Sequence, residues 1–206
     1  MKKQIFRTAD QKEFVGLFEG LCMRRHAWQA WGDFVEACAI AVSNSCDKDS
    51  PDRDKREKRY RQIMAGYEPA EQTIFPQLFG ALTEALEQNP DQDFLGDMFM
   101  RLELGSHWHG QFFTPYHLCR AIAEIQMGDV GERIQKRGWV SINDCACGAG
   151  ALLIAARNVM MRAGRDWSSQ DLFVAQDIDR TAALMCYLQL SLLGCAGYVV
   201  IADSLR

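Results

Sequence analysis

The stretch from residue 139 to residue 164 constrains the fold of this 206-residue chain more than any other part of its sequence. It begins with a predicted strand, Trp139–Asn143, and continues through the loop D-C-A-C-G-A-G, Asp144–Gly150, into a predicted helix, Ala151–Ala163. Gly164 follows directly, and glycine is a common helix terminator. A strand that leads through a glycine-containing loop into a helix is the first half of a β-α-β unit.

Two further strands are predicted downstream. Leu172–Gln176 and Tyr198–Ala202 are rich in residues that strands favour, and a predicted helix, Arg180–Leu193, lies between them and ends at Gly194. The resulting β-α-β-α-β order implies parallel strands joined by right-handed crossovers. We therefore predict an α/β fold that contains half of a doubly wound parallel sheet.

A helix is also predicted just before the first strand. Thr114 is expected to be its N-cap and Pro115 its first helical residue, where the missing N–H of proline costs nothing. The helix continues through Ile125. Its N-terminus would attract a carboxylate group of a ligand.

The chain before the sheet is predicted to be helical. Apolar residues recur there at the spacing of one helical face in three separate segments. We divide the chain into a helical N-terminal region, residues 1–105, and a part that contains the sheet, residues 106–206. The three apolar series are Phe14, Leu17, Phe18 and Leu21; Trp28, Trp31, Phe34, Val35 and Cys38; and Phe75, Leu78, Phe79, Leu82 and Leu86.

One segment of the helical region is strongly basic. Residues 53–61 contain six Lys and Arg residues and two acidic residues. The segment is either the solvated face of a helix, which we favour, or a contact for nucleic acid. The chain as a whole has a net charge of −4, which argues against strong binding to DNA phosphates, so DNA recognition is expected to reside elsewhere.

Acidic residues follow each predicted strand, at the edge of the sheet where ligands of such folds bind. Asp144 can receive an ammonium group or orient its own loop, and Asp177 can accept hydrogen bonds from both hydroxyls of a ribose. Asp179 is expected to be the N-cap of the next helix. Asp203 either accepts a hydrogen bond from an adenine amino group or serves as a turn residue.

The loop after the first strand has two glycines that can bring the backbone close to a ligand. Gly148 and Gly150 have no Cβ, although C-G-A-G is also common in ordinary strand-to-helix turns. Leu153 occupies the third glycine position of a dinucleotide-binding fingerprint, which argues against a nicotinamide cofactor. Phe112 and Phe113 are expected to pack either on the ligand or against the sheet.

Four short motifs occur in a characteristic order: G-Q-F-F-T-P at Gly110–Pro115, D-C-A-C-G-A-G at Asp144–Gly150, Q-D-I-D at Gln176–Asp179 and A-D-S at Ala202–Ser204. Together they resemble the N-6 adenine DNA methyltransferases, in particular the modification subunits of type I restriction systems. The resemblance covers roughly residues 94–206.

The resemblance implies a Rossmann-like methyltransferase domain, partial in this chain, with S-adenosyl-L-methionine as its cofactor. It also implies that DNA is reached through the full-length protein or partner subunits, with a specificity subunit or a second copy of the chain as a partner. Carried over by position, the expected cofactor-binding residues are Gln111, Phe112, Phe113, Thr114, Pro115, Asp144, Ala146, Gly148, Ala149, Gly150, Asp177 and Asp203.

The chain departs from the family pattern in three respects. The family usually has Pro at the position of Cys145 and often Ser or Thr at the position of Ala149. Its catalytic tetrapeptide, Asn/Asp-Pro-Pro-aromatic, does not occur in the 206 residues. We therefore expect a cofactor-binding portion without a catalytic residue and without methyl transfer of its own. The alternatives are a non-catalytic cofactor-binding or assembly module and, should the motif match be fortuitous, a dehydrogenase.

Metal binding and membrane association are not expected. The close pair Cys145 and Cys147 lacks a second pair at ligand spacing, and His107, His109 and His117 are interpreted as packing residues. The eight irregularly spaced cysteines, without an export signal, indicate reduced thiols in a cytoplasmic protein. No apolar run approaches the roughly 20 residues that span a bilayer.

The first strand lies at the centre of the sheet in the family, with a fourth strand beside it that is not among these residues. The edge of the first strand on that side therefore has unpaired backbone N–H and C=O groups, which proteins seldom leave uncovered. We favour a cover by the N-terminal helices, through Trp28, Trp31, Phe75 and Phe79, over pairing with another copy of the chain or a poorly ordered, aggregation-prone edge.

Overall fold

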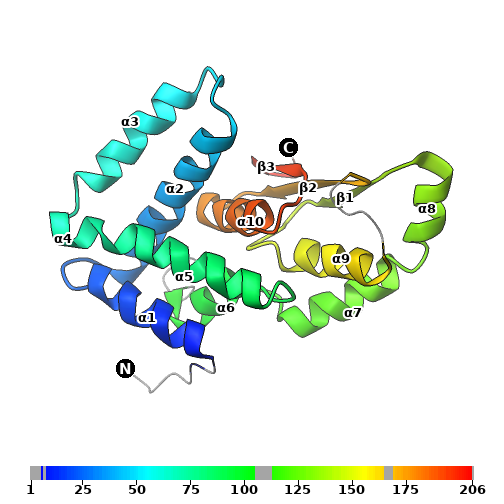
Figure 1. The fold of residues 1–206 in the computed structure, drawn as a ribbon, viewed down its shortest axis with the longest axis horizontal. Helices are drawn as coiled ribbons and strands as arrows, with labels where there is room; N and C mark the ends of the chain where they lie inside the picture. The colour runs from blue at the N-terminus through cyan, green and yellow to red at the C-terminus, as the bar shows by residue number, and fades with distance from the viewer. Residues whose placement is uncertain (1–5, 7, 105–112, 165–168, 206) are drawn as a thin grey trace.

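A computed structural model describes residues 6, 8–104, 113–164 and 169–205 of the chain and has the predicted α/β fold. In Figure 1 the N-terminal helices occupy one side of the molecule and the sheet lies toward the other, with α10 between them. The strands are parallel, and their order in the sheet is β1-β2-β3. The predicted half of a doubly wound sheet is confirmed.

The three strands are β1 (Val140–Asp144), β2 (Asp171–Asp177) and β3 (Gly197–Ile201). Each lies within one residue of its predicted bounds. In the register of the sheet, Asp144 pairs with Ala175, and Asp177 pairs with Ile201. The carboxyl ends of the strands therefore form one edge, where the predicted ligand-binding residues follow.

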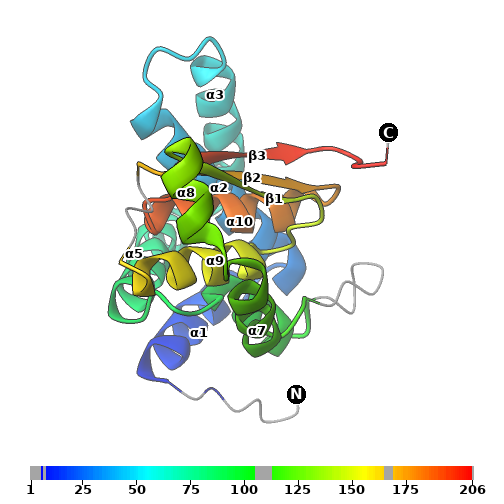
Figure 2. The same cartoon turned by 90° about the vertical axis from the view of Figure 1, so that its right-hand side faces the viewer.

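Two helices connect the strands, α9 (Ala151–Arg162) and α10 (Arg180–Leu192), and both lie on the same face of the sheet (Figure 2). Soon after each helix comes a glycine in the left-handed conformation, Gly164 with φ of 68° and Gly194 with φ of 72°. Residues with a Cβ rarely adopt this conformation, so these glycines end the helices as predicted.

Before the sheet, α7 (Tyr116–Gln126) packs against α9, and α8 (Val130–Arg137) leads into β1. The prediction of Thr114 as N-cap was wrong by one residue, because Pro115 has a ψ of 132° and is itself the cap position. No side chain caps the helix. The short helix α8 was not predicted, since most of its residues are polar.

The N-terminal region is helical, as predicted. Trp31 lies at its centre and makes edge-to-face contacts with Phe14 and Phe18, with ring centroids 6.0 and 5.5 Å apart. None of the described helices is long and apolar enough to span a membrane. The helices of this region are α1 (Ala9–Leu21), α2 (Ala27–Cys46), α3 (Arg53–Met64), α4 (Pro69–Gln72), α5 (Ile74–Gln88) and α6 (Phe94–Arg101).

The helical region is joined to the sheet by a continuous apolar core. Helices α2, α5 and α6 pack against α10, and the indole Nε1 of Trp31 donates to Sδ of Met185 at 3.4 Å. The expectation that aromatic residues of this region cover β1 was wrong. Trp31 is buried among other aromatic rings and against α10, and Phe75 packs on Tyr67. Among the described residues, β1 pairs only with β2.

Candidate functional site

The carboxyl edge of the sheet is held together by the side chain of Asp177. Its Oδ2 accepts a hydrogen bond from the backbone N–H of Gly148 at 2.8 Å, and its Oδ1 accepts one from the N–H of Asp179, also at 2.8 Å. The backbone carbonyl of the same residue accepts from the N–H of Ala202 at 3.1 Å. Asp177 therefore ties the segments that follow β1, β2 and β3 to one another.

The two glycines of the loop after β1 both adopt left-handed backbone conformations, with φ of 52° at Gly148 and 95° at Gly150. A Cβ on Gly150 would lie 2.9 Å from Sγ of Cys186, and one on Gly148 would lie 3.0 Å from the ring of Phe113. Both glycines thus allow close approach of other parts of the chain. They bring α10 beneath the loop and the Phe113 ring beside it.

The loop is also supported from below by buried polar groups. Nε2 of Gln189 donates to the carbonyl oxygen of Ala149 and to Oδ1 of Asp93, each at 2.8 Å, and Oε1 of Gln189 accepts from the N–H of Leu95 at 3.0 Å. Gln189 is fully buried. Sequence reasoning missed this residue, and its only signal was a glutamine within an otherwise apolar helical segment.

The site has an excess of negative charge. Burial raises the pKa of Asp144, a hydrogen bond from the N–H of Ala146 lowers it in part, and the nearby Asp177 carboxylate raises it further. The pKa of Asp179 is raised by burial as well, against the hydrogen bond from its capping partner, and again by the charge of Asp177. A cluster of carboxylates at one edge favours a ligand with cationic groups or hydroxyl donors.

Most of the predicted residues of the strand-end loops meet at this edge. Asp179 caps α10 by accepting from the N–H of Ala182 at 2.7 Å, as predicted. Asp203 follows β3 and accepts from the N–H of Leu205 at 3.0 Å, which is the turn geometry considered for it. The side chain of Ala149 is buried, so this residue offers a ligand only its backbone.

The segment before α7 is described in part. Phe113 is half-buried and contacts the ring of Phe99, with centroids 5.2 Å apart, whereas Thr114 and Pro115 are exposed. Gln111 and Phe112 lie outside the described residues, as do His107 and His109. Among the residues that are described, no group of three or more His, Cys, Asp and Glu side chains is arranged to hold a metal ion.

Ile178 is a second residue that sequence reasoning missed. It lies between Asp177 and Asp179 at the end of β2, and 71% of its surface is exposed. An exposed isoleucine at the edge where the acidic residues gather offers an apolar surface to a ligand with a flat ring. Its signal in the sequence was the single apolar residue within Q-D-I-D.

Comparison with known proteins bears on the same part of the chain. A search of curated proteins found no match. The family model described as N-6 DNA Methylase matches residues 91–206, which is more than half of the chain and includes α6, the whole sheet and every loop of the candidate site. The chain belongs to the N-6 DNA methylase family.

Proposed function

We propose that the chain binds S-adenosyl-L-methionine at the carboxyl edge of its sheet, as the cofactor-binding portion of a DNA adenine-N6 methyltransferase of a restriction-modification system. Family membership supports the class of reaction. The observation that carries the cofactor assignment is the hydrogen bond between Gly148 and Asp177, which joins the glycine loop to an acidic strand end. The negative charge of the edge suits the sulfonium and ammonium groups of this cofactor.

Each acidic residue of the edge has a proposed role. Asp177 accepts hydrogen bonds from the ribose hydroxyls with the lone pairs that its two backbone contacts leave, since an ionised carboxylate has about four acceptor sites. Asp144 receives the ammonium group, and Asp203 accepts from the adenine amino group. Ile178 lies against the adenine ring. When bound, the cofactor supplies an electrophilic methyl group, which these residues orient.

The remaining proposed contacts come from the glycine loop and the segment before α7. They are the residues that the family resemblance indicates: Gln111, Phe112, Phe113, Thr114, Pro115, Ala146, Gly148, Ala149 and Gly150. Within the described part of this set, the contact of Phe113 with Gly148 supports a common site.

The wider assignments are also proposals. We propose a division into a helical region, residues 1–105, and a cofactor-binding part, residues 106–206, which share one apolar core and therefore fold together. The eight cysteines are all free, which supports a cytoplasmic location. DNA is reached through the full-length protein or partner subunits, and a specificity subunit or a second copy of the chain is the proposed partner.

A second candidate is a non-catalytic cofactor-binding or assembly module. The 206 residues contain no Asn/Asp-Pro-Pro-aromatic tetrapeptide, so neither candidate has this catalytic segment within them. Incubation with labelled cofactor and adenine-containing DNA tests the second candidate. Transfer of label to adenine N6 by this chain would exclude the module and require a catalytic segment of a different kind.

Calorimetric titration with S-adenosylmethionine and its demethylated product tests the cofactor assignment. Each charge-assisted hydrogen bond is worth about 1.5–3 kcal/mol, so Asp177→Ala, which removes two, should weaken binding at least tenfold. Asp129→Ala, at an exposed acidic residue that is the N-cap of α8, is the matched control and should bind normally. Unchanged affinity in Asp177→Ala would remove this residue from the site, and preferential binding of a nicotinamide cofactor would contradict the proposal as a whole.

A further inference from the structure

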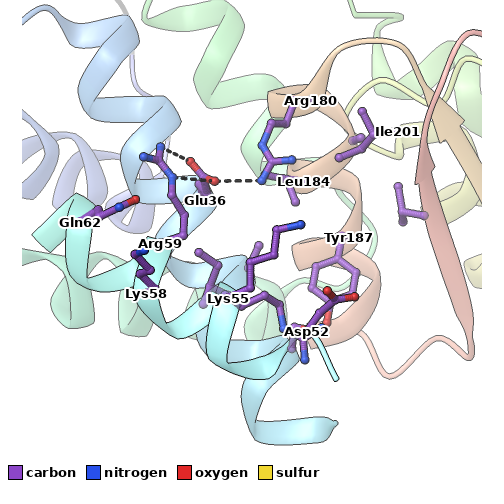
Figure 3. A pocket seen from close by; sticks show the side chains of 16 residues that line it. Glu36, Asp52, Lys55, Lys58, Arg59, Gln62, Arg180, Leu184, Tyr187 and Ile201 are labelled. Atoms are coloured by element: carbon purple, nitrogen blue, oxygen red, sulfur yellow. Dashed lines mark hydrogen bonds and ion pairs between the residues drawn. The ribbon is translucent and has the colours of Figure 1, made fainter. Parts of the chain in front are cut away.

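A second site candidate lies outside the carboxyl edge of the sheet. A groove of about 960 Å³ runs between α3 on one wall and β3 on the other, with α2 and α10 contributing to its lining (Figure 3). Five cationic residues line it and only two acidic ones, Glu36 and Asp52. The groove is therefore positively charged although the chain carries a net charge of −4. The cationic residues are Lys55, Arg56, Lys58 and Arg59 on α3, and Arg180 at the start of α10.

One of the two acidic residues is already neutralised and organises the groove. Glu36 on α2 accepts from Arg59 at 2.6 Å and from Arg180 at 2.9 Å, and Figure 3 shows these two guanidinium groups reaching it from different elements. Burial opposes the ionisation of Glu36, but the two arginines lower its pKa below the usual value. The carboxylate therefore stays ionised and holds both arginines at the groove.

The lysines of α3, unlike Arg59 and Arg180, do not pair with Glu36. Lys55 and Lys58 are exposed, and among the described residues neither ammonium group has a hydrogen-bond or ion-pair partner. Their ammonium groups and the outer faces of Arg59 and Arg180 can therefore bind an anionic ligand without displacing an internal partner. Four residues of the basic segment, Lys55, Arg56, Lys58 and Arg59, thus line a groove, and this placement supports a contact for nucleic acid over a merely solvated helix face.

The floor and the far wall of the groove are apolar. Ile40, Leu184 and Val199 line it, together with Ile201 and the aromatic ring of Tyr187. A DNA duplex presents phosphates on a convex surface and keeps its bases stacked inside. Its bases therefore cannot contact the apolar residues of this floor. A single strand has alternating phosphates and unstacked bases, which suit a cationic groove with an aromatic side chain in it.

The groove opens beside the proposed cofactor edge. Arg180 is three residues after Asp177 in the chain, and Ile201 pairs with Asp177 across the sheet. A strand of nucleic acid in the groove would thus pass the ends of β2 and β3. The two sites nevertheless use different residues, so either can exist without the other.

We propose that the groove between α3, α10 and β3 binds a single-stranded segment of nucleic acid, with Lys55, Lys58, Arg59 and Arg180 on the phosphates and Tyr187 stacked on a base. The inference does not depend on cofactor binding, and a chain that fails to bind S-adenosylmethionine still tests it.

Fluorescence anisotropy with a labelled oligothymidylate tests the proposal in the unmodified chain and in a Lys55→Glu/Lys58→Glu variant. The variant should bind at least tenfold more weakly, and the slope of log affinity against log salt should fall by about 1.4, since each phosphate contact on a single strand contributes about 0.7. Lys136→Glu/Arg137→Glu on α8 changes the net charge equally at exposed positions and should bind like the unmodified chain.

The aromatic contact is tested separately. Tyr187→Ala should weaken oligothymidylate binding about tenfold, because stacking on one base is worth about 1–3 kcal/mol, whereas Tyr187→Phe keeps the ring and should retain the affinity. Circular dichroism establishes that each variant is folded. The proposal would be overturned by equal or tighter binding of a duplex of the same length, by equal losses in the α3 and α8 variants, or by equally effective competition from polyglutamate, which would indicate an acidic protein segment as the ligand.

Discussion

Gln189 donates its side-chain amide to the carboxylate of Asp93 at 2.8 Å, and both residues are buried. The two lie far apart in the sequence, on α10 and at the N-cap of α6. The same amide group holds the carbonyl of Ala149, so this contact connects the helical region to the glycine loop of the proposed cofactor site. Every polar atom of the Gln189 side chain has a partner in this arrangement.

Replacing this residue should destabilise the whole fold. Gln189→Leu has a similar volume but leaves the N–H of Leu95, the carbonyl of Ala149 and the carboxyl group of Asp93 without their shared partner. We expect a loss of about 2–6 kcal/mol in the free energy of unfolding, because the groups of Leu95 and Ala149 become unsatisfied at about 1–3 kcal/mol each, whereas Asp93 keeps the hydrogen bond from Gly96. Urea denaturation of the variant and of the unmodified chain measures this loss in the free energy of unfolding. Gln88→Leu on the exposed face of α5 is the matched control, and a loss as small as in that variant would contradict the role of Gln189.

Asp93 should make the stability of the protein depend on pH. Burial raises its pKa above the ordinary value of 3.8, although hydrogen bonds from Gln189 and Gly96 lower it in part. The folded state therefore holds the proton longer than the unfolded state does. The contribution of this group is fully present below pH 3.8 and is lost as the pH rises through the raised pKa.

Comparing the pH dependence of stability in Asp93→Asn and in the unmodified chain isolates the contribution of Asp93. The asparagine oxygen still accepts from Gln189 and Gly96 but does not titrate, so the unmodified chain should lose stability relative to the variant as the pH rises from below 3.8. Urea midpoints over this range measure the difference. Asp129→Asn removes a carboxyl whose pKa is lowered by Arg133 and should change the slope with the opposite sign. Parallel curves for the unmodified chain and Asp93→Asn would disprove the prediction.

Gly150 should not tolerate a side chain. Gly150→Ala combines a φ of 95° with a Cβ placed 2.9 Å from Sγ of Cys186, and we expect a loss of about 2–4 kcal/mol from backbone strain and overpacking. Gly80→Ala on α5 has open space around the new Cβ and should instead stabilise the chain by about 0.5–1 kcal/mol. Thermal unfolding of both variants tests whether Gly150→Ala lowers the stability and Gly80→Ala raises it. Equal effects at the two positions would show that helix propensity alone is being measured.

Ile178 should affect ligand binding without affecting folding. Ile178→Ser removes apolar surface that is exposed in the chain, so stability should stay within about 0.5 kcal/mol of the unmodified protein. Affinity for S-adenosylmethionine should fall about tenfold, since each buried methylene contributes about 0.8 kcal/mol. Calorimetry measures this affinity, with Ile125→Ser on α7 as the control, since Ile125 is also mostly exposed. Normal binding by Ile178→Ser would remove this residue from the site.

Local patterns predicted the secondary structure around the sheet with small errors. The strand Asp171–Asp177 and the helix Arg180–Leu192 were found because apolar runs, Gly194 and the capping residue Asp179 act over a few neighbouring residues. The start of α7 was misplaced because the ψ of Pro115 decides it, and proline restricts only φ. The helix α8 was missed because few of its residues contribute to the core.

The sequence by itself therefore determined the α/β class, the parallel strands and the acidic residues at the strand ends, since these depend on short-range periodicity and on the rule that ligands bind at the carboxyl edge. Only the tertiary structure decided which distant residues meet. Trp31 packs on Met185, Glu36 joins Arg59 to Arg180, and Gln189 reaches Asp93. Such contacts depend on how whole helices pack, and no local pattern of residues encodes them.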